Sequence, residues 1–210
     1  MKIHDISMLI SEDMAVYKNN QQKRPKIKTS KDFSNSDVYE SSITLDLHTG
    51  THIDMPFHMM ESGNKIPELD LSRCVNKCKV IDLTTVKDKI TRNELINKGI
   101  VTEDFVLFKT RNSYTEEFDK NFVYLEKTGA YFLSEINVLG VGIDSLGIER
   151  NQPSHYSHKI LLQKNIVVLE GLRLKEINEG EYFLFAVPLN IKDVEGAPTR
   201  AILVEGLSFK

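Results

Sequence analysis

Alternating apolar and polar residues predict β-strands along most of the chain. The clearest case is the run at Ile43, Leu45 and Leu47, where every second residue is apolar, as in a strand with one buried face. Other segments rich in β-branched and aromatic residues are bounded by polar, turn-forming stretches. The predicted strands cover residues 2–10, 27–33, 38–47, 79–83, 104–110, 138–144, 166–169, 182–189 and 201–204.

A different pattern predicts three helices. Thr91 and Glu94 stand at the spacing of a capping box, in which each side chain bonds a backbone N–H of the first turn. Residues 129–136 have helical character, and residues 153–164 predict a longer helix with Ser154 as its cap.

The order of these elements sets the fold class. Strands alternate with single helices only in the middle of the chain, whereas the N-terminal third is mostly strand. The segment 195–198 between the last two predicted strands is expected to be a loop. This order favours an α/β protein with a mixed sheet or partly closed barrel, and with helices packed outside.

Composition narrows the class of protein. A chain of 210 residues fits a single domain, 1–210, with a substantial core. The net charge of −3 gives no support to nucleic-acid binding, and no apolar run reaches membrane-spanning length. Without a signal peptide at its start, the chain is expected in the cytoplasm, and Cys74 and Cys78 are expected to be reduced thiols.

One stretch carries most of the candidate chemistry. Three of the six histidines, His48, His52 and His58, fall within residues 46–58 together with Asp54. Imidazole nitrogens and carboxylate oxygens are ligands for zinc and neighbouring metals. Gly50 permits a tight turn, and equal parity in an extended segment would place His52, Asp54 and His58 on one face. These residues predict a metal site rather than a set of unrelated polar side chains.

Further ligands must come from elsewhere in the chain. Glu170 directly follows the predicted buried strand 166–169, where a charge normally has a metal or an ionic partner. An ion pair with Arg173 is the alternative. His155 and His158 stand three residues apart on the preceding helix, and the pattern alone does not choose between them.

The uninterrupted sequence His48-Thr49-Gly50-Thr51-His52-Ile53-Asp54-Met55-Pro56-Phe57-His58 resembles the signature H-x-G-T-H-x-D-x-P-x-H of the putative-cyclase family. This family of metal-dependent amide hydrolases includes bacterial kynurenine formamidase and isatin hydrolase. A second family block, H-x3-L-x7-E-x-L, is present from His158 to Leu172. The resemblance extends over nearly the whole chain.

The resemblance implies a swivelling β/β/α fold, a homodimer or homotetramer, and a small-molecule substrate. By the same resemblance His48, His52 and Asp54 would hold one metal ion. Asp54, His158 and Glu170 would hold a second, which selects His158 over His155. His58 would then be the general acid/base and not a ligand. Zinc is the first expectation for the metal, in one or two ions, and manganese is the alternative.

The implied reaction is hydrolysis of an aryl formamide or cyclic amide. N-formylkynurenine, which gives kynurenine and formate in tryptophan catabolism, is the first expectation; an isatin-like cyclic amide or a lactone is the alternative. A metal-bound hydroxide would attack the carbonyl and His58 would move the proton. Where many kynurenine formamidases have Trp followed by Pro-Gly-Asp-Pro, this chain has Tyr17-Lys18-Asn19-Asn20. Tyr17 is therefore expected to contact the substrate, and the departure bears on substrate choice.

Two other functions fit the same ligands. Two histidines and a carboxylate also suit Fe(II) oxygenases, which consume oxygen. A non-catalytic metal-binding or ligand-binding module would bind metal without turnover, although it would have no need of an acid/base such as His58.

Overall fold

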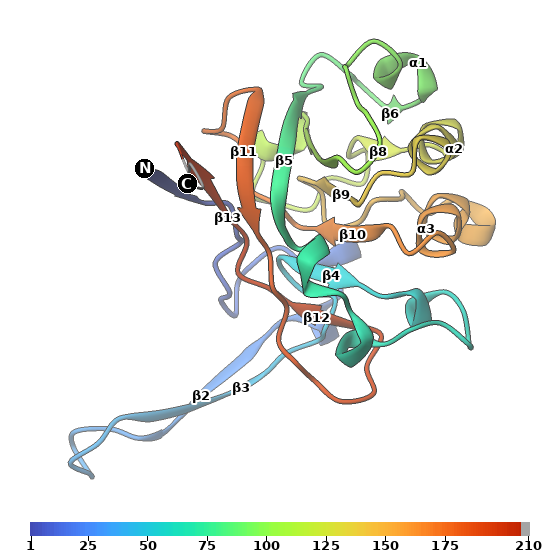
Figure 1. Ribbon diagram of the computed structural model, residues 1–210. Coiled ribbons are helices and arrows are strands. Elements are labelled where there is room, and N and C mark those ends of the chain that lie inside the picture. Colours follow the sequence, from blue (N-terminus) through green and yellow to red (C-terminus); the bar gives the residue numbers. More distant parts are fainter. Residues whose placement is uncertain (207–210) are drawn as a thin grey trace.

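A computed structural model describes residues 1–206 of the chain. A curled nine-stranded sheet dominates the fold, in the spatial order β1-β13-β11-β5-β7-β9-β10-β4-β12 (Figure 1). The predicted mixed sheet is confirmed, because β5, β7, β9 and β10 run parallel while their neighbours on both sides pair antiparallel. Its strands are β1 (Lys2–Asp5), β4 (His52–Asp54), β5 (Val75–Asp82), β7 (Phe105–Lys109), β9 (Gly140–Ile143), β10 (Val167–Glu170), β11 (Gly180–Phe185), β12 (Gly196–Pro198) and β13 (Ile202–Glu205).

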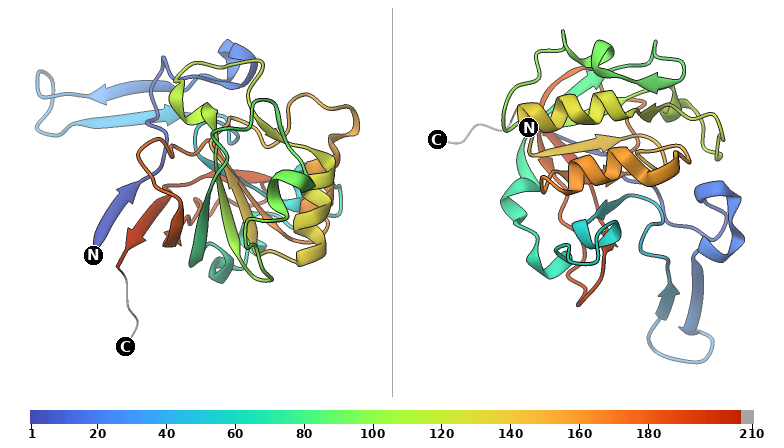
Figure 2. Two further views of the ribbon diagram at one scale, coloured as in Figure 1. Left: turned by 90° about the horizontal axis from the view of Figure 1, so that it is seen from above. Right: turned by 90° about the vertical axis from the view of Figure 1, so that its right-hand side faces the viewer.

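Three α-helices lie against the outer face of this sheet. They are α1 (Arg92–Leu95), α2 (Lys127–Ile136) and α3 (Tyr156–Leu162). Figure 2 shows α2 and α3 side by side over the strands, and the two helices contact each other. A small parallel sheet of β6 (Lys89–Ile90) and β8 (Tyr124–Leu125) lies at the same side.

Apolar side chains fill both faces of the sheet. One core cluster lies between the strands and the helices and includes Phe108, Leu133 and Leu161. The other lies within the curl of the sheet and includes Ile53 and Phe105, both fully buried. Ile53 therefore points away from the face that carries its neighbours His52 and Asp54, as the pleat of a strand requires.

A long ribbon projects from this body (Figures 1 and 2). It consists of β2 (Lys26–Lys31) paired antiparallel with β3 (Glu40–Thr44), and all residues of both strands are exposed. The two strands were predicted, but the expected burial of one face was wrong, because Ile43 is 52% exposed. The ribbon pairs with itself instead of joining the main sheet.

Other predicted boundaries also shift. Residues 6–10 leave β1 instead of extending it, and segment 195–198 contains β12 rather than a loop. Ser154 does not cap α3, because it has φ 72° and lies one residue before the N-cap, His155. The capping box of Thr91 and Glu94 is confirmed.

Short 3₁₀ turns join several of the strands. They are η1 (Tyr17–Asn19), η2 (Gln21–Lys23), η3 (Pro56–His58), η4 (Ile66–Glu68), η5 (Leu71–Arg73), η6 (Arg111–Tyr114) and η7 (Pro153–His155). Cys74 and Cys78 are buried free thiols, as expected. Within residues 1–206, none of the helices is long and apolar enough to cross a membrane. The last residues of the predicted domain, 207–210, lie outside the described part.

Candidate metal centre

A tight turn after the ribbon presents His48. Gly50 has φ +74°, a left-handed conformation that glycine adopts without strain. The backbone N–H of His48 donates to the Asp46 carboxylate over 3.0 Å. Gly196 of β12 packs against the imidazole, and a Cβ at that position would stand 3.0 Å from Cε1 of His48. The turn and the absence of a side chain at Gly196 together make room for the ring.

Strand β4 carries the next two side chains. His52 and Asp54 have equal parity and point to the same face, toward α3. Nδ1 of His52 lies 2.9 Å from the Gly50 carbonyl oxygen, which can only accept, so Nδ1 carries the proton. Nε2 of His52 consequently faces the two carboxylates, 3.4 Å from Oδ1 of Asp54 and 3.4 Å from Oε2 of Glu170.

The sheet brings Glu170 to this position from the far end of the chain. Strand β10 pairs antiparallel with β4, and the register places Glu170 directly opposite His52. The next residue, Gly171, has φ +70° and approaches the Gly50 turn so closely that an added Cβ would lie 2.2 Å from the Gly50 oxygen. Helix α3 adds His158, whose Nε2 lies 3.2 Å from Oε1 of Glu170 and 3.4 Å from Oδ2 of Asp54.

The cluster formed by Asp54, Glu170 and the surrounding histidines is buried. When these histidines are neutral, the two carboxylates give it a net negative charge. Asp54 and Glu170 are 2% and 4% exposed, and within residues 1–206 their ion pairs are all with histidines. Burial opposes the charged form of every member, but the interactions with the Asp54 and Glu170 carboxylates outweigh it and raise the pKa of His52 to about 10. The interactions with His158 and His52 likewise overcome burial and the nearby Asp54 charge, and hold the pKa of Glu170 at about 2. The site therefore favours positive charge.

Two buried atoms of the cluster have room for a further partner. In the described part of the chain, Nε2 of His52 and Oδ2 of Asp54 make ion-pair contacts of 3.4 Å but have no hydrogen-bond partner. Unpaired polar atoms in a buried site are costly unless a ligand satisfies them. His52, Asp54 and Glu170 offer ligand atoms that all lie within 4.8 Å of one another, as do His48, Asp54 and His58. Nitrogen and carboxylate oxygen donors at this spacing suit a divalent metal.

His58 lies beside the cluster in a different electrostatic setting. It ends η3, and its ring lies 4.2 Å from that of His48 and 5.8 Å from that of His158. Burial lowers the pKa of His58, in contrast to the raised pKa of His52 and His158. A pKa below the ordinary value leaves the His58 imidazole neutral near pH 7.

A cavity of about 210 Å³ opens onto these side chains. Its walls include Tyr17, Lys23 and Met59 together with His48, His58 and His158. The Tyr17 ring makes edge contacts with Phe118 and Phe122, at centroid distances of 5.4 and 6.3 Å. The structure thus places Tyr17 in the wall of the cavity that contains the candidate ligands.

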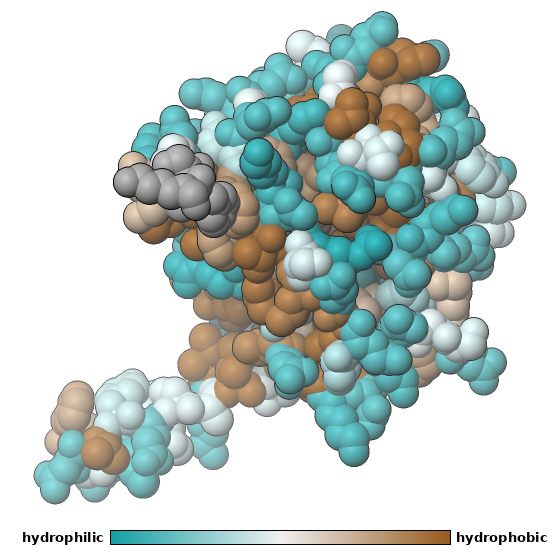
Figure 3. All heavy atoms as spheres, viewed as in Figure 1, coloured by the Kyte–Doolittle hydropathy of each residue, from teal (hydrophilic) through white to brown (hydrophobic). Residues whose placement is uncertain are grey.

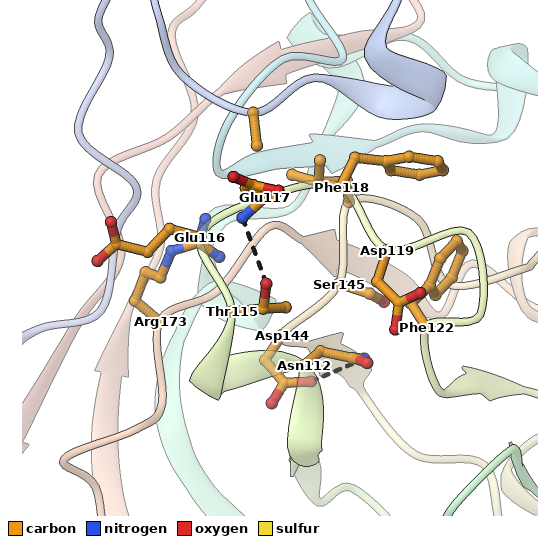
Figure 4. Close-up of a pocket in the computed structure, with 12 residues that line it drawn as sticks. Asn112, Thr115, Glu116, Glu117, Phe118, Asp119, Phe122, Asp144, Ser145 and Arg173 are labelled. Atoms are coloured by element: carbon orange, nitrogen blue, oxygen red, sulfur yellow. Dashed lines mark hydrogen bonds between the residues drawn. The ribbon is translucent and has the colours of Figure 1, made fainter.

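A second cavity nearby has different properties (Figure 4). It holds about 30 Å³, close to the space of one or two water molecules. Figure 4 shows Arg173 and Glu116 at one side of it and Phe118 and Phe122 at the other. Its buried carboxylate, Asp144, accepts hydrogen bonds from Thr110 and Ser113, so it is already satisfied.

The structure brings together all the residues that the sequence singled out for chemistry. His48, His52, Asp54, His58, His158 and Glu170 surround one site, with Tyr17 in the adjoining wall. The alternative pair of Glu170 with Arg173 is wrong, because Glu170 contacts His52 and His158. His155 stays largely exposed at the cavity rim.

Two carboxylates near the site were missed. Oε2 of Glu149 lies 2.6 Å from Nδ1 of His158, and Oε1 of Glu195 lies 3.1 Å from Nε2 of His48. Glu149 follows a predicted buried strand by five residues, and Glu195 falls in a segment expected to be a loop. No spacing rule links either residue to its histidine partner, because the contacts form only in the folded chain.

Comparison with known proteins places this arrangement among hydrolases. Residues 4–150 match the model of the family described as Putative cyclase. The chain is 30% identical to the kynurenine formamidase of Bacillus mycoides (strain KBAB4) over 201 residues, which is 95% of each chain.

Solved structures agree with the fold. A structure described as a predicted metal-dependent hydrolase from Bacillus stearothermophilus is 44% identical, with a TM-score of 0.89 over 96% of this chain and 97% of that one. Isatin hydrolase A from Ralstonia solanacearum is 22% identical, with a TM-score of 0.84 over 97% and 92% of the two chains. At that identity the second likeness concerns the fold alone.

Proposed function

Because this chain belongs to the putative-cyclase family of metal-dependent hydrolases, and is itself a hydrolase, we propose that it cleaves an aryl formamide or a cyclic amide. N-formylkynurenine is the foremost substrate, with kynurenine and formate as products. The name of the Bacillus mycoides relative supports that choice. An isatin-like cyclic amide or a lactone is the second choice, which the altered segment at Tyr17 favours.

One observation carries the proposal. Glu170 lies 3.4 Å from Nε2 of His52 and 3.2 Å from Nε2 of His158, in a buried cluster whose His52 Nε2 and Asp54 Oδ2 have no hydrogen-bond partner in the described chain. A site that served only stability would satisfy these atoms within the protein. A nitrogen and a carboxylate oxygen that lack hydrogen bonds in a buried site are suited to binding a metal cation.

The residues divide into two sets for metal. His48, His52 and Asp54 would hold one ion, and Asp54, His158 and Glu170 would hold a second. Zinc is the first choice and manganese the second, since imidazole and carboxylate serve both. A bound divalent metal supplies Lewis acidity and makes water a nucleophile near neutral pH.

His58 has the properties of the proton-transfer group. Its lowered pKa leaves the imidazole neutral near pH 7, so it can accept a proton from the attacking water. It would then donate that proton to the leaving nitrogen as the C–N bond breaks, which yields an amine and a carboxylic acid. Tyr17, in the wall of the 210 Å³ cavity, would contact the aromatic part of the substrate.

The proposal includes a homodimer or homotetramer in the cytoplasm. The ribbon supports self-association, because it exposes large apolar side chains that one copy does not cover. These are Ile27, Phe33, Val38, Tyr39 and Ile43, between 45% and 76% exposed. Figure 3 shows further hydrophobic side chains gathered on the body near the base of the ribbon.

Metal analysis coupled to a hydrolysis screen tests the function. The purified protein is analysed for Zn and Mn, then assayed with N-formylkynurenine, isatin, a cyclic imide and a lactone, before and after chelation. We expect hydrolysis that needs no oxygen, disappears on chelation and returns with the metal. D54N, which removes the carboxylate shared by both metal sets, is the matched inactive control.

Two outcomes would contradict the proposal. Oxygen consumption with an oxo-acid co-substrate would assign the site to an Fe(II) oxygenase. Tight metal without turnover on any substrate of the screen would assign it to a binding module.

A further inference from the structure

Glu149 is a buried carboxylate that the proposed reaction does not use. It lies between β9 and α3 and is 4% exposed. Its Oε1 accepts a hydrogen bond from the backbone N–H of Ser157 over 2.6 Å, and its Oε2 lies 2.6 Å from Nδ1 of His158. Its ion pairs among residues 1–206 are with His158 and His155 only. A charge buried at this depth requires such partners.

The short distance defines what Glu149 does to His158. Two donor atoms on one metal, each about 2.0–2.2 Å from it, stand roughly 3 Å or more apart. The 2.6 Å separation is therefore a hydrogen bond in which Nδ1–H donates to the carboxylate, and not a pair of ligands around an ion. With Nδ1–H donated to Glu149, Nε2 is the nitrogen of His158 that faces Asp54 and Glu170, and it is the atom that would bind a metal.

We propose that Glu149 is a positioning residue, which fixes the tautomer and ring orientation of His158 for metal binding. The inference rests on the proposed function, because it assigns His158 to a metal. A carboxylate that accepts from the far nitrogen of a histidine ligand both orients the ring and raises its basicity. Glu149 also lines the 210 Å³ cavity, but its two carboxylate oxygens are bonded to the Ser157 N–H and to Nδ1 of His158, so it would act through His158.

The preceding residue supports the other half of the same ligand set. The backbone N–H of Ile148 donates to Oε1 of Glu170 over 2.6 Å. Ile148 is fully buried, and its carbonyl accepts from the backbone N–H of Leu125 over 2.8 Å. One anchored dipeptide, Ile148-Glu149, thus holds both Glu170 and His158. Metal binding by these two ligands depends on a segment that supplies neither of them.

Glutamine is the discriminating substitution at this position. The carboxylate accepts from two N–H groups at once, whereas a glutamine amide has one acceptor oxygen and turns an NH₂ toward the second donor. E149Q keeps the size of the side chain, so folding should be largely preserved. We expect the affinity for the ion held by His158 and Glu170 to fall about 10–100-fold.

The experiment measures metal rather than activity. Wild type, E149Q, H155A, H158A and the double variant E149Q/H158A are compared by chelator competition and by the visible spectrum of the Co²⁺-substituted proteins. H155A is the matched control, because His155 also approaches Glu149, at 3.5 Å, but its side chain is 54% exposed. Its metal affinity should equal that of the wild type. Thermal unfolding of the metal-free proteins verifies that each variant is folded.

The double variant separates positioning from general destabilisation. If Glu149 acts through His158, E149Q has no further effect on metal affinity once His158 is absent. Wild-type affinity in E149Q, or an equal further loss in the H158A background, would overturn the inference. A wild-type protein that binds no divalent metal would instead contradict the proposed function.

Discussion

His58 differs from the other histidines of the site in the direction of its pKa shift. Carboxylates surround His52 and His158 and raise their pKa values, whereas burial lowers that of His58. Histidines with a raised pKa and a histidine with a lowered pKa thus stand within one cluster. The sequence pattern from His48 to His58 identified all the candidate site residues in that stretch. Their different surroundings became visible only in the folded structure.

Replacing His58 tests this division. H58A should retain its metal, because the proposed ligand sets do not include His58, and kcat should fall about 10²–10⁴-fold with the loss of proton transfer. Metal content and steady-state kinetics measured on the same preparation provide the answer. Loss of metal from H58A would make His58 a ligand, which its distance to His48 and Asp54 allows.

The remaining site residues show where sequence reasoning stops. Glu170 was found because it follows a buried strand, and His158 was chosen over His155 by family resemblance. The structure gives the physical difference: His158 faces Glu170 from within the protein, whereas His155 lies at the rim. Glu149 carries no local signal, since its partner His158 lies nine residues away on a helix that begins only at Tyr156.

Among the secondary-structure elements, the pairing of β4 with β10 assembles the site. It brings His52 opposite Glu170, and the close approach of Gly171 to the Gly50 turn fixes the distance between the two chain segments. Strand β10 was predicted from its apolar run, whereas β4 was not among the predicted strands. Their pairing was not predicted either, because β4 has three residues and its partner lies more than 100 positions further on.

Gly171 should tolerate alanine less well than another glycine of similar φ. Both Gly171 (φ +70°) and Gly99 (φ +64°) adopt left-handed backbone, but a Cβ at Gly171 meets the Gly50 oxygen at 2.2 Å while one at Gly99 meets nothing within 4 Å. We expect G99A to cost about 1–2 kcal/mol of unfolding free energy and G171A about 2–5 kcal/mol. Urea denaturation of both variants measures the difference. Equal costs would show that the contact with Gly50 relaxes freely.

The capping box of α1 should make a small pH-dependent contribution to stability. The hydrogen bond from Thr91 lowers the pKa of Glu94 from its ordinary value of 4.5. Since the pKa is lower in the folded state, the stabilisation is present above pH 4.5 and is lost as the pH falls through the lowered value. E94Q should cost roughly 0.3–1 kcal/mol at pH 7, and this cost should shrink as the pH falls through the lowered pKa of Glu94.

Urea denaturation across this pH range tests the capping box, with E181Q as the control for removal of one charge. Glu181 is exposed on β11. A cost of E94Q that stays constant with pH would show that the charge of Glu94 contributes nothing.

At the scale of the whole molecule, the ribbon differs most from the prediction, because neither face of it is buried. Its strands were predicted from alternating apolar and polar residues. Such alternation predicts an apolar strand face, but it does not show whether the same chain or a second molecule buries that face. Ile27 and Ile43 pair across β2 and β3 and are 45% and 52% exposed. The curled mixed sheet, in contrast, followed from the order of elements, because helices occur only between the parallel strands.

Removing the ribbon should change assembly and leave the metal centre intact. Replacing residues 27–43 by an Asn-Gly turn should convert the proposed dimer or tetramer to a smaller species, since two-stranded ribbons with apolar faces need a partner. Light scattering measures the mass of the assembly, and metal analysis measures the occupancy of the metal site. I27S/I43S, which keeps the ribbon but removes its apolar pair, should weaken assembly in the same direction. An unchanged mass in both variants would show that the ribbon takes no part in assembly.

The two ends of the ribbon meet at the wall of the cavity. Lys23, which lines the cavity, lies 3.3 Å from Asp46, whose carboxylate also holds the backbone of His48. The stretch between these two residues leaves and rejoins the body at one point, so a change in its length need not move the metal ligands. Among descendants of a common ancestor, its length and sequence can diverge quickly while the reaction is inherited unchanged.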